Sequence, residues 1–467
     1  EKSNAIPILG EAVMEVWQAD RGELLATGGE TYAYNKMSGY WTCFDRGLTQ
    51  ELEVEIHKAI AAIDANPTLT LINNIKKWIV IHPNIYKKGI RFNDAGLIIC
   101  SNCAVDPKTG MQQPHSPKHY ALYGVDCEYQ PDAKCPTWLE YLKEAFKDRE
   151  DAEDLTTTVQ EWFGAALVRN KPRELMKALV AFGPSRTGKT VMAGVCRTLI
   201  GGQTCALRAK EFSEQFGRQP LINCSGWIAD DAVSPGDLLD AESWKVIVSG
   251  EPTSIPRKNL EAWEGSLDIP VCITSNTLPR VKDQSEAVYN RTIFLPMTVT
   301  QSEEDVAGRI IISEIRDEIA GVLNWAIEGW QRLIERGFFK PPKTIIEATQ
   351  KYMDDQNPCG TWLTECVERD NDTMIDRRDI HAACQGFQVE YEGVPLNRTL
   401  GARKVYAGLL QRFPHIIDYR KANNRYFVGI KLNDDGVRFL ENHKERNSYE
   451  TIGSGAGLIN QDIPERS

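Results

Sequence analysis

The residues with the clearest chemical potential lie in the stretch Gly183-Pro184-Ser185-Arg186-Thr187-Gly188-Lys189-Thr190. This stretch matches the phosphate-binding pattern G-x-x-x-x-G-K-[ST] at every required position. Its glycines let successive backbone N–H groups turn inward around a phosphate. We expect Lys189 to reach the β- and γ-phosphates of ATP, and the Thr190 hydroxyl to bind Mg²⁺. The alternative is a glycine-rich turn before a helix, and the complete motif favours the phosphate site.

The elements around this loop must place it correctly. The apolar run Ala178–Phe182 predicts a strand directly before the loop. Residues from Thr190 to about Ile200 predict a helix that ends at Gly201-Gly202. The N-terminus of that helix would add its positive dipole end to the phosphate site. The sequence therefore predicts the strand–loop–helix unit that a phosphate loop requires.

A pair of adjacent acids follows a second apolar run. The run Gly226–Ala229 predicts a strand, and Asp230 and Asp231 come directly after it. We expect Asp230 to bind Mg²⁺, usually through water, and Asp231 to orient or deprotonate the attacking water. The alternative is a solvated acid pair in a turn. The position of the pair, at the end of an apolar strand about 40 residues after the loop, favours the catalytic interpretation.

Three further patterns complete the central region. The apolar run from Ile269 to Ile273 leads into polar residues that end at Asn276, which could bond the γ-phosphate or the attacking water. Residues 250–259, between the second and third strands, predict a hairpin with a basic tip. Arg291 comes just before another predicted strand.

The first 175 residues predict a mixed α+β domain. We expect a hairpin within residues 32–44, helices at 51–65 and 71–78, a β-rich stretch at 90–105, and a largely helical stretch from 135 to 170. Cys100 and Cys103 form a C-x-x-C, and His115 and His119 follow. Because no second ligand pair completes a zinc spacing, buried structural cysteines are favoured over a zinc site.

The region after the central core predicts a helical connector or lid at 301–357 and then helices at 378–390 and 398–413. Two strands follow, at 416–419 and 426–432, and this order suggests a winged helix. Residues 397–431 carry eight basic residues and one acid, 8 − 1 = +7, which favours contact with DNA phosphates. The alternative is a basic surface that packs on an acidic domain. A flexible tail is expected at 436–467. The candidate DNA-binding residues here are Arg398, Arg403, Lys404, Arg420, Lys421 and Arg425.

The length and composition of the chain limit the classes of function that it can have. The chain has 467 residues and a net charge of −11, so any nucleic-acid contact must come from a local basic patch. It has no apolar run of the roughly 18 residues needed to span a membrane. Its 12 scattered cysteines suit a reducing cytoplasm. The chain does not begin with Met, which is consistent with a piece of a longer polypeptide.

The order of these motifs resembles the superfamily 3 helicases of viruses, phages and plasmids. Residues 250–258 resemble the pore hairpin motif of that family, and residues 271–276 its sensor-1 strand. Residues 228–232 are similar to the double-acid motif of papillomavirus helicases. The N-terminal region resembles the domain that precedes the motor in poxvirus-type and phage primase–helicases, through Phe92-Asn93-Asp94-Ala95-Gly96, Asp106-Pro107-Lys108-Thr109-Gly110, His115-Ser116-Pro117 and Cys135-Pro136-Thr137-Trp138. Together the resemblance covers about residues 30–435.

The resemblance implies roles for residues outside the loop. Lys245 falls where the family contacts the nucleotide of the neighbouring subunit, and Arg257 and Lys258 fall at the hairpin tip that grips DNA. Without the resemblance, Lys258 would be interpreted as a solvated loop charge. Arg291 falls at the arginine finger, with Arg280 or Arg257 as alternatives. A finger supplied in trans requires head-to-tail packing of subunits, which can close into a ring.

The resemblance thus implies an α/β fold with a P-loop, AAA+-like ATPase core at 176–300 and a parallel sheet. It implies an ATP- and Mg²⁺-dependent replicative DNA helicase in the host-cell cytoplasm. This helicase would form a hexameric ring that translocates 3′ to 5′ on single-stranded DNA, and a winged helix could also contact duplex DNA. A primase or polymerase domain upstream, or as a separate partner, would fit. The alternatives are a double-stranded-DNA motor or origin-melting initiator, and a P-loop kinase for small molecules, which the paired acids and the separate basic module disfavour.

Overall fold

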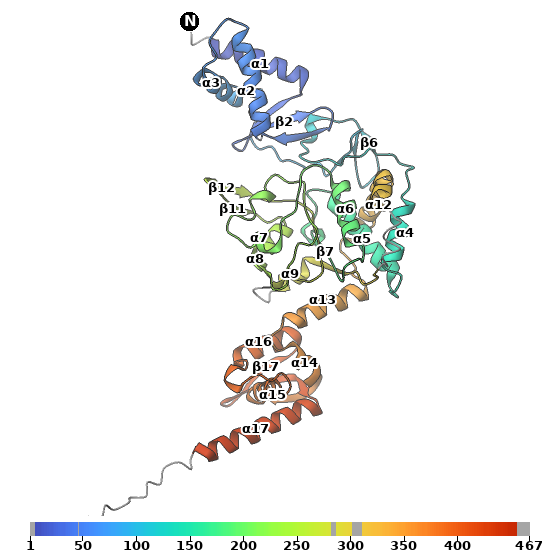
Figure 1. Cartoon of the computed structure of the whole chain (residues 1–467), viewed down its shortest axis with the longest axis vertical. Coiled ribbons are helices and arrows are strands. Elements are labelled where there is room, and N and C mark those ends of the chain that lie inside the picture. The colour runs from blue at the N-terminus through green and yellow to red at the C-terminus, as the bar shows by residue number, and fades with distance from the viewer. Residues whose placement is uncertain (1–4, 45, 282–285, 301–310, 455–467) are drawn as a thin grey trace, which may run out of the picture. The chain divides into compact units, whose positions relative to one another are not determined.

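The computed structural model describes residues 5–44, 46–281, 286–300 and 311–454. The chain forms two compact units, Glu1–Thr349 and Gln350–Ser467 (Figure 1). Helix α13 (Lys343–Gln356) contains the junction, which lies before the predicted boundary at 357. Within the described ranges, none of the helices combines the length and apolar character that a bilayer crossing needs.

A five-stranded, fully parallel sheet lies at the centre of the first unit. Its strand order is β15-β7-β13-β9-β8. The strands are β7 (Ala178–Phe182), β8 (Thr204–Cys205), β9 (Gly226–Ala229), β13 (Val271–Ser275) and β15 (Thr292–Pro296). Their apolar runs are buried on both faces, as expected of a parallel sheet covered by helices. The strands predicted before the loop, before the acid pair, before Asn276 and after Arg291 are confirmed.

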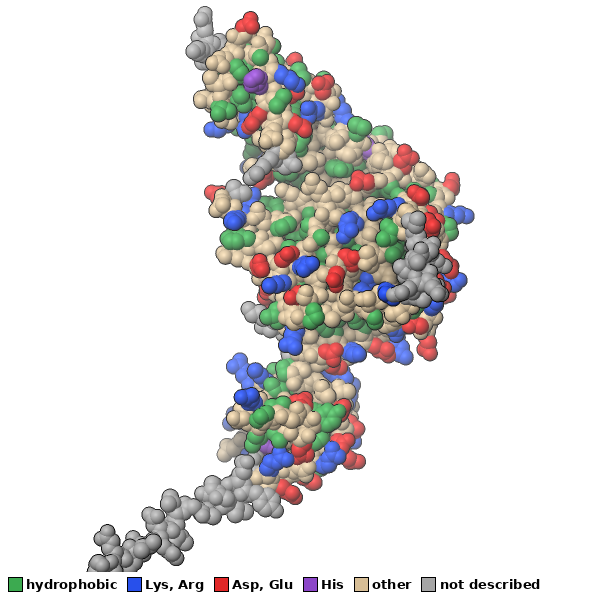
Figure 2. All heavy atoms as spheres, viewed as in Figure 1, with side chains coloured by type: hydrophobic (Ala, Val, Ile, Leu, Met, Phe, Trp, Pro, Cys, Tyr) green, Lys and Arg blue, Asp and Glu red, His purple; other side chains and the backbone are tan. Residues whose placement is uncertain are grey.

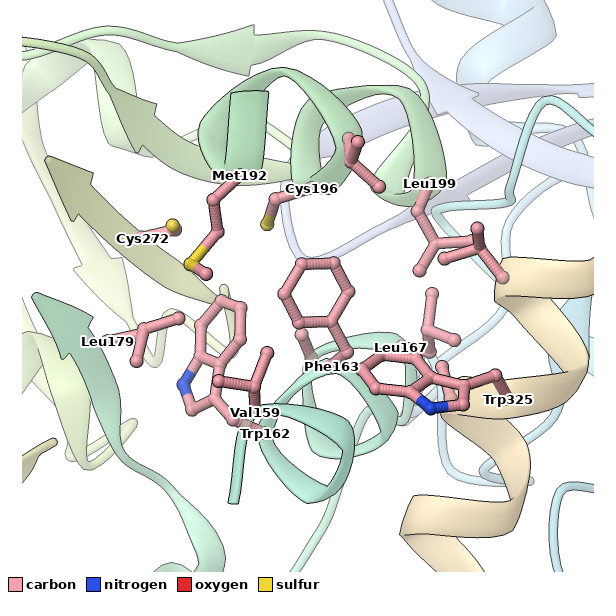
Figure 3. Packing of buried hydrophobic residues seen from close by; sticks show 14 of the residues in the cluster. Val159, Trp162, Phe163, Leu167, Leu179, Met192, Cys196, Leu199, Cys272 and Trp325 are labelled. Carbon is pink, nitrogen blue, oxygen red and sulfur yellow. The ribbon is translucent and has the colours of Figure 1, made fainter. Parts of the chain in front are cut away.

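Three helices contribute large parts of the hydrophobic core next to this sheet. They are α5 (Ala152–Leu167), α6 (Lys189–Ile200) and α12 (Ile319–Arg336). Figure 3 shows side chains of α6 facing those of α5, α12 and the sheet, namely Met192, Cys196, Leu199, Val159, Trp162, Phe163, Leu167, Leu179, Cys272 and Trp325. Helix α5 precedes residue 175, so this core crosses the predicted boundary between the N-terminal domain and the central region.

Close packing joins α12 to the preceding helices. A Cβ on Gly164 of α5 would lie 2.3 Å from the Ala326 carbonyl oxygen of α12, so the absence of a side chain lets the two backbones approach. The buried Glu161 carboxylate accepts a hydrogen bond from Arg332 at 2.8 Å and also pairs with Arg336. The Glu318 carboxylate accepts a hydrogen bond at 2.9 Å from the backbone amide of Thr137, which lies in the first turn of α4 (Pro136–Ala145). The predicted connector is therefore built into the core that supports the loop.

The N-terminal elements up to about residue 85 have a core of their own, whereas Ile98 and Val105 belong to the central core. The predicted hairpin and two helices are confirmed, whereas α1 was not predicted and the expected β-rich stretch at 90–105 contains only two short strands. The elements are α1 (Ala5–Asp20), β1 (Leu24–Thr27), β2 (Glu30–Asn35), β3 (Tyr40–Cys43), α2 (Arg46–Ala61), α3 (Leu69–Ile81), β4 (Ile98–Ile99), β5 (Ala104–Val105) and β6 (Gln112–Gln113).

Short elements complete the first unit. Residues 301–310 of the predicted connector lie outside the described residues. The elements are η1 (Pro117–His119), η2 (Arg173–Leu175), α7 (Ala209–Phe212), η3 (Gln219–Leu221), β10 (Leu238–Leu239), α8 (Ala241–Val248), β11 (Thr253–Arg257), β12 (Leu260–Gly265), β14 (Arg280–Val281), α9 (Glu286–Asn290) and α11 (Ile311–Asp317).

The second unit combines helices with a three-stranded antiparallel sheet of order β16-β18-β17. The two predicted helices and the predicted hairpin are confirmed, and β16 was not predicted. After α13 the elements are α14 (Gly360–Cys366), β16 (Val367–Asp376), α15 (Arg377–Glu390), η4 (Leu396–Arg398), α16 (Ala402–Arg412), β17 (Ile417–Lys421), β18 (Asn424–Leu432) and α17 (Asp434–Ser454).

The flexible tail predicted from residue 436 is wrong over residues 436–454, which continue α17. Phe439 is buried and its ring lies 5.3 Å from that of Phe387 on α15. His443, one turn later, is also buried. Apolar contacts of this first half, rather than strong helix propensity, stabilise α17. The remaining predicted tail, 455–467, lies outside the described residues.

Candidate active site

The glycine-rich loop connects β7 to α6, and its backbone shape depends on both glycines. Gly183 has φ +149°, and a Cβ there would lie 1.9 Å from the Met297 carbonyl oxygen. Gly188 has φ +85°, and its Cβ would lie 2.8 Å from the Tyr141 ring. Any side chain at either position would collide with these neighbours or strain the backbone. The loop therefore keeps the tight curvature that brings it to the N-terminus of α6.

Lys189 lies within the curve of this loop. Its Nζ donates to the carbonyl oxygens of Gly183 at 2.9 Å and Pro184 at 2.5 Å, and to Thr187 Oγ1 at 3.3 Å. Burial lowers the pKa of Lys189 below its ordinary value, and the two nearby carboxylates only partly offset this. The Lys189 amine is thus directed at the interior of the loop.

The acid pair lies at the carboxyl end of β9, next to the end of β13. The pairing of Ala229 with Ile273 brings Thr274 beside Asp230. The Thr274 hydroxyl donates to Asp230 Oδ1, and the Asp231 amide donates to Thr274 Oγ1 at 3.4 Å. Asp231 itself adopts a left-handed backbone with φ +49°. Thr274 therefore fixes the first acid, while the backbone turns the second in another direction.

The loop and the acids border one cleft of about 370 Å³. Its volume lies within the range of about 300–1,000 Å³ that is usual for small-molecule sites. The cleft opens at the carboxyl ends of parallel strands, where ligands commonly bind in such sheets. It is lined by Ser185, Arg186, Thr187, Gly188, Lys189, Thr190, Val191, Asp230, Asp231, Thr274, Ser275 and Asn276. The structure thus brings together the predicted loop residues, the acid pair and Asn276, from three separate strand ends.

Arg291 lies at the amino-terminal ends of the strands of the same sheet, whereas the cleft lies at their carboxyl ends. It directly precedes β15, and its carbonyl oxygen accepts a hydrogen bond from the Ala178 amide at the start of β7. Its guanidinium contacts the Ser249 hydroxyl and lies 3.8 Å from the Glu251 carboxylate. The predicted Lys245 lies one turn before Ser249, at the C-terminal part of α8. Neither Lys245 nor Arg291 borders the cleft of its own chain.

The predicted hairpin forms between β11 and β12 (Figure 1). Lys258 and Asn259 lie at its turn, where Asn259 has φ +60° and the Lys258 side chain is exposed. The side chain of the adjacent Arg257 donates to the Glu261 carbonyl oxygen at 2.8 Å. Arg280, the other arginine considered as a finger, is exposed on β14.

The six predicted basic residues of the second unit are spread over several elements. Arg398 ends η4, Arg403 and Lys404 begin α16, and the others flank the β17–β18 turn. In Figure 2, Lys and Arg side chains gather on the part of this unit where Figure 1 labels α16.

The local charge count of +7 overstates the basic surface of residues 397–431. Arg412 pairs with Asp354 at 3.3 Å, and Lys431 lies near Glu368 and Asp370. All three acids lie outside the segment that was counted. The exposed positive charge is therefore concentrated at the start of α16 and at the β17–β18 turn.

The cysteines of the C-x-x-C lie in the turn that joins β4 to β5. Cys100 and Cys103 are buried, and the Cys100 amide donates to the Cys103 carbonyl oxygen at 2.8 Å. The predicted His115 uses Nε2 to bond the Cys100 carbonyl oxygen at 2.7 Å, and His119 lies in η1. Among the described residues, the structure gathers no set of three or more His, Cys, Asp or Glu side chains as metal ligands.

Two residues of the site escaped the sequence analysis. Tyr141 donates its hydroxyl to the Gly188 carbonyl oxygen at 2.9 Å, although it precedes the loop by more than 40 residues. Thr274 was noted only as part of a polar strand end. Thr274 is the first polar residue after an apolar run, and this pattern could have identified it as a site residue. No local pattern identifies Tyr141.

Comparison with known proteins assigns two regions of the chain. Residues 28–147 match the family described as D5 N terminal like, and residues 181–291 match a family of unknown function, DUF5906. The chain therefore carries a D5 N terminal like region followed by a DUF5906 region. The second region contains the whole loop, both acids, Asn276, the hairpin and Arg291.

Solved structures similar to this chain include three of the NrS-1 C-terminal region. Its A form apo structure has a TM-score of 0.46 and 12% identity, and the match covers 90% of this chain and 98% of that one. An A form apo structure of its residues 305–718 has a TM-score of 0.45 and 11% identity, covering 90% and 99%. A further apo structure of the same residues has a TM-score of 0.45 and 11% identity, covering 89% and 98%.

Proposed function

We propose that this protein is an ATP-dependent DNA helicase of the superfamily 3 type that acts in viral, phage or plasmid replication. The observation that carries the proposal is the cleft in which the loop, Asp230, Asp231 and Asn276 meet. The family match over residues 28–147 supports it, because that stretch includes all four motifs that resemble primase–helicases of the poxvirus and phage type.

The chemistry at the cleft would be phosphoryl transfer to water. The loop amides and Lys189 would bind the β- and γ-phosphates, and Asn276 would contact the γ-phosphate or the water. Thr190 and Asp230 supply oxygen donors of the kind that Mg²⁺ prefers, and both face the cleft. The metal would neutralise charge on the phosphates. The Thr274 hydroxyl donates to the Asp230 carboxylate, and the neighbouring Asp231 carboxylate would accept the proton of the attacking water.

The position of Arg291 supports a head-to-tail oligomer, which we propose to be a hexameric ring. Arg291 and Lys245 lie away from the cleft of their own chain, so a neighbouring subunit would have to supply the nucleotide that they contact. In such a ring the hairpin residues Arg257 and Lys258 would face DNA phosphates in the pore. We further propose 3′ to 5′ translocation on single-stranded DNA.

The second unit would provide additional contacts to DNA. Its helices and β17–β18 hairpin fit a winged-helix-like arrangement, in which Arg398 of η4 and Arg403 and Lys404 at the start of α16 would contact phosphates. We place the protein in the host-cell cytoplasm, with an upstream primase domain or a separate primase as a fitting partner.

The decisive test combines ATP hydrolysis with strand displacement. The wild-type chain should hydrolyse ATP faster with single-stranded DNA and should displace a labelled strand. Lys189→Ala should lose both activities, because the phosphate charge loses its main partner. An exposed lysine on α13, Lys351→Ala, serves as a matched control.

Other outcomes of the same test would identify a different function. ATP hydrolysis that duplex DNA stimulates, without strand displacement, would favour a double-stranded-DNA motor or an initiator. Phosphoryl transfer to a small molecule, with no response to DNA, would favour a kinase. Normal hydrolysis by Lys189→Ala would remove the loop from the mechanism.

A further inference from the structure

The three-stranded sheet of the second unit has two very different faces. On one face, Phe427 is buried and its ring lies 5.5 Å from that of Tyr406 on α16. The Arg377 guanidinium lies 4.2 Å from the Tyr406 ring centroid and pairs with Asp418 of the edge strand at 3.0 Å. This face of the sheet is therefore covered by α15 and α16.

The strand register places apolar and aromatic residues on the opposite face. Ile417 pairs with Val428, which pairs in turn with Met374, and Tyr419 pairs with Tyr426. Since side chains alternate along a strand, these five residues share the face that Phe427 and Asp418 do not use. Ile417 is 63% exposed, Tyr419 46% and Met374 45%. We call this surface, made of Met374, Ile417, Tyr419, Tyr426 and Val428, the outer face.

Positive charge lies at one end of the outer face, around the β17–β18 turn. Arg420 and Lys421 end β17 and are exposed, and by the same alternation Lys421 shares the outer face whereas Arg420 shares the face of Asp418. Arg378 at the start of α15 is 74% exposed at its side chain. Arg378 also contacts Asn424 of the turn at 3.2 Å. The neighbouring acid Asp376 is engaged by Arg378 at 2.7 Å. The turn end of the sheet therefore keeps a cationic rim.

Three other acids of the sheet, Asp418, Glu368 and Asp370, have cationic neighbours of their own, whereas Asp372 of β16 is exposed. Asp418 is engaged from the covered face by Arg377 and by Arg425 at 2.7 Å. At the far end of β16, Glu368 and Asp370 lie within 4 Å of Lys431. Negative charge near the outer face is thus largely neutralised, which favours an anionic ligand over a cationic one.

We propose that the outer face binds unpaired bases of single-stranded DNA, a proposal that rests on the DNA-processing function above. Exposed tyrosine rings offer flat surfaces on which bases stack, and the cationic rim would contact the adjoining phosphates. Duplex DNA keeps its bases stacked inside, so it gains little from exposed aromatic rings. A single strand therefore fits both halves of this surface, the apolar centre and the basic rim.

The test uses the full-length chain and two fluorescent probes, a short 2-aminopurine-labelled oligothymidine and a duplex of equal length. Tyr419→Ala should weaken single-strand binding about tenfold, whereas Tyr419→Phe should retain it because the ring remains. The dependence of affinity on salt should stay unchanged in Tyr419→Ala, since no phosphate contact is removed. Tyr391→Ala is the matched control, because Tyr391 is 60% exposed just after α15 in the same unit.

Several results would overturn the inference. Equal affinities for Tyr419→Ala and Tyr391→Ala, or equal losses on single-stranded and duplex probes, would exclude base stacking. A changed subunit association in sedimentation, with single-strand binding intact, would assign the outer face to a protein contact. Thermal unfolding of each variant verifies that the second unit is intact.

Measuring ATP hydrolysis together with single-strand binding distinguishes failure of this inference from failure of the proposed helicase function. A wild-type chain that binds single strands through Tyr419 but does not hydrolyse ATP would keep this inference and remove the proposed function. A wild-type chain with DNA-stimulated hydrolysis and no effect of Tyr419→Ala on single-strand binding would do the reverse.

Discussion

The strongest expectation concerns Arg291, which we propose acts on the nucleotide of a neighbouring subunit. Arg291 directly precedes Thr292, and Thr292 pairs with Ala178 at the start of β7. The loop begins only after the five residues of β7, and Arg291 lies one residue before the paired Thr292, so at ~3.3 Å per residue it lies about 20 Å from the loop along the sheet. An arginine side chain is too short to bridge this separation. If Arg291 acts on ATP, it must act in trans.

The magnitudes favour release of Arg291 to a neighbouring site. Within its own chain, the guanidinium has a hydrogen bond to Ser249 and a partly exposed ion pair with Glu251. Together these contacts are worth about 1–2 kcal/mol. An arginine finger accelerates phosphoryl transfer by about 10³–10⁵, which corresponds to roughly 4–7 kcal/mol of barrier. Transfer of Arg291 to the γ-phosphate in the transition state is therefore favourable.

Arg291→Ala should form normal oligomers and bind ATP, yet hydrolyse it about 10³–10⁵ times more slowly. Mixing this variant with Lys189→Ala provides the decisive assay. An interface is complete when the Arg291→Ala subunit supplies the loop and the Lys189→Ala subunit supplies the finger. With equal mixing this combination occurs at about one quarter of head-to-tail interfaces, so up to about a quarter of wild-type hydrolysis should return.

Subunit exchange must be verified by reassembling the two variants from dissociated subunits and detecting mixed oligomers with differently labelled chains. Mixed oligomers that recover no hydrolysis would refute the trans role of Arg291. The same experiment with Arg280→Ala or Arg257→Ala in place of Arg291→Ala would then identify the finger.

Three other predictions follow from the described contacts. Asp231→Asn should bind ATP normally but not hydrolyse it, as measured by nucleotide affinity and turnover; collapse of binding would reverse the roles of Asp230 and Asp231. Although burial alone raises the pKa of Asp268, Lys171 and Arg169 lower it below its ordinary value, so its stabilising effect is present above about pH 4 and lost as the pH falls through the lowered pKa. Asp268→Asn should therefore cost about 3 kcal/mol at neutral pH and flatten the acid limb of the stability profile in denaturant titrations; an unchanged profile would contradict this. Replacing Arg403 and Lys404 by Ala should reduce the salt slope of duplex binding by about 0.9 per lost phosphate contact, and an unchanged slope would favour a packing role.

The sequence by itself predicted the contiguous parts of the candidate site. The loop motif, its flanking strand and helix, and the acid pair after an apolar run are all local patterns. They were predictable because glycine positions, apolar runs and helix ends depend on nearby residues. The hairpin at Lys258 and the strand after Arg291 were predictable for the same reason.

The tertiary structure decided which of these parts meet. The pairing of β13 with β9 brings Thr274 onto Asp230, and no local pattern specifies the register between strands separated by more than 40 residues. The parallel pairing of β15 with β7 places Arg291 at the amino-terminal ends of the strands, whereas the loop lies at the carboxyl end of β7. Both outcomes depend on long-range strand pairing, which burial of complementary apolar surfaces selects.

The surface charge of the second unit and the conformation of residues 436–454 also depended on tertiary contacts that the sequence does not reveal locally. The sequence correctly gave a local excess of basic residues in the second unit, but the acids that pair with Arg412 and Lys431 come from outside the counted segment. Likewise, the polar composition after residue 436 suggested a flexible tail. Burial of Phe439 against Phe387 instead stabilises a helix there, because tertiary packing of a few apolar residues outweighs weak local propensity.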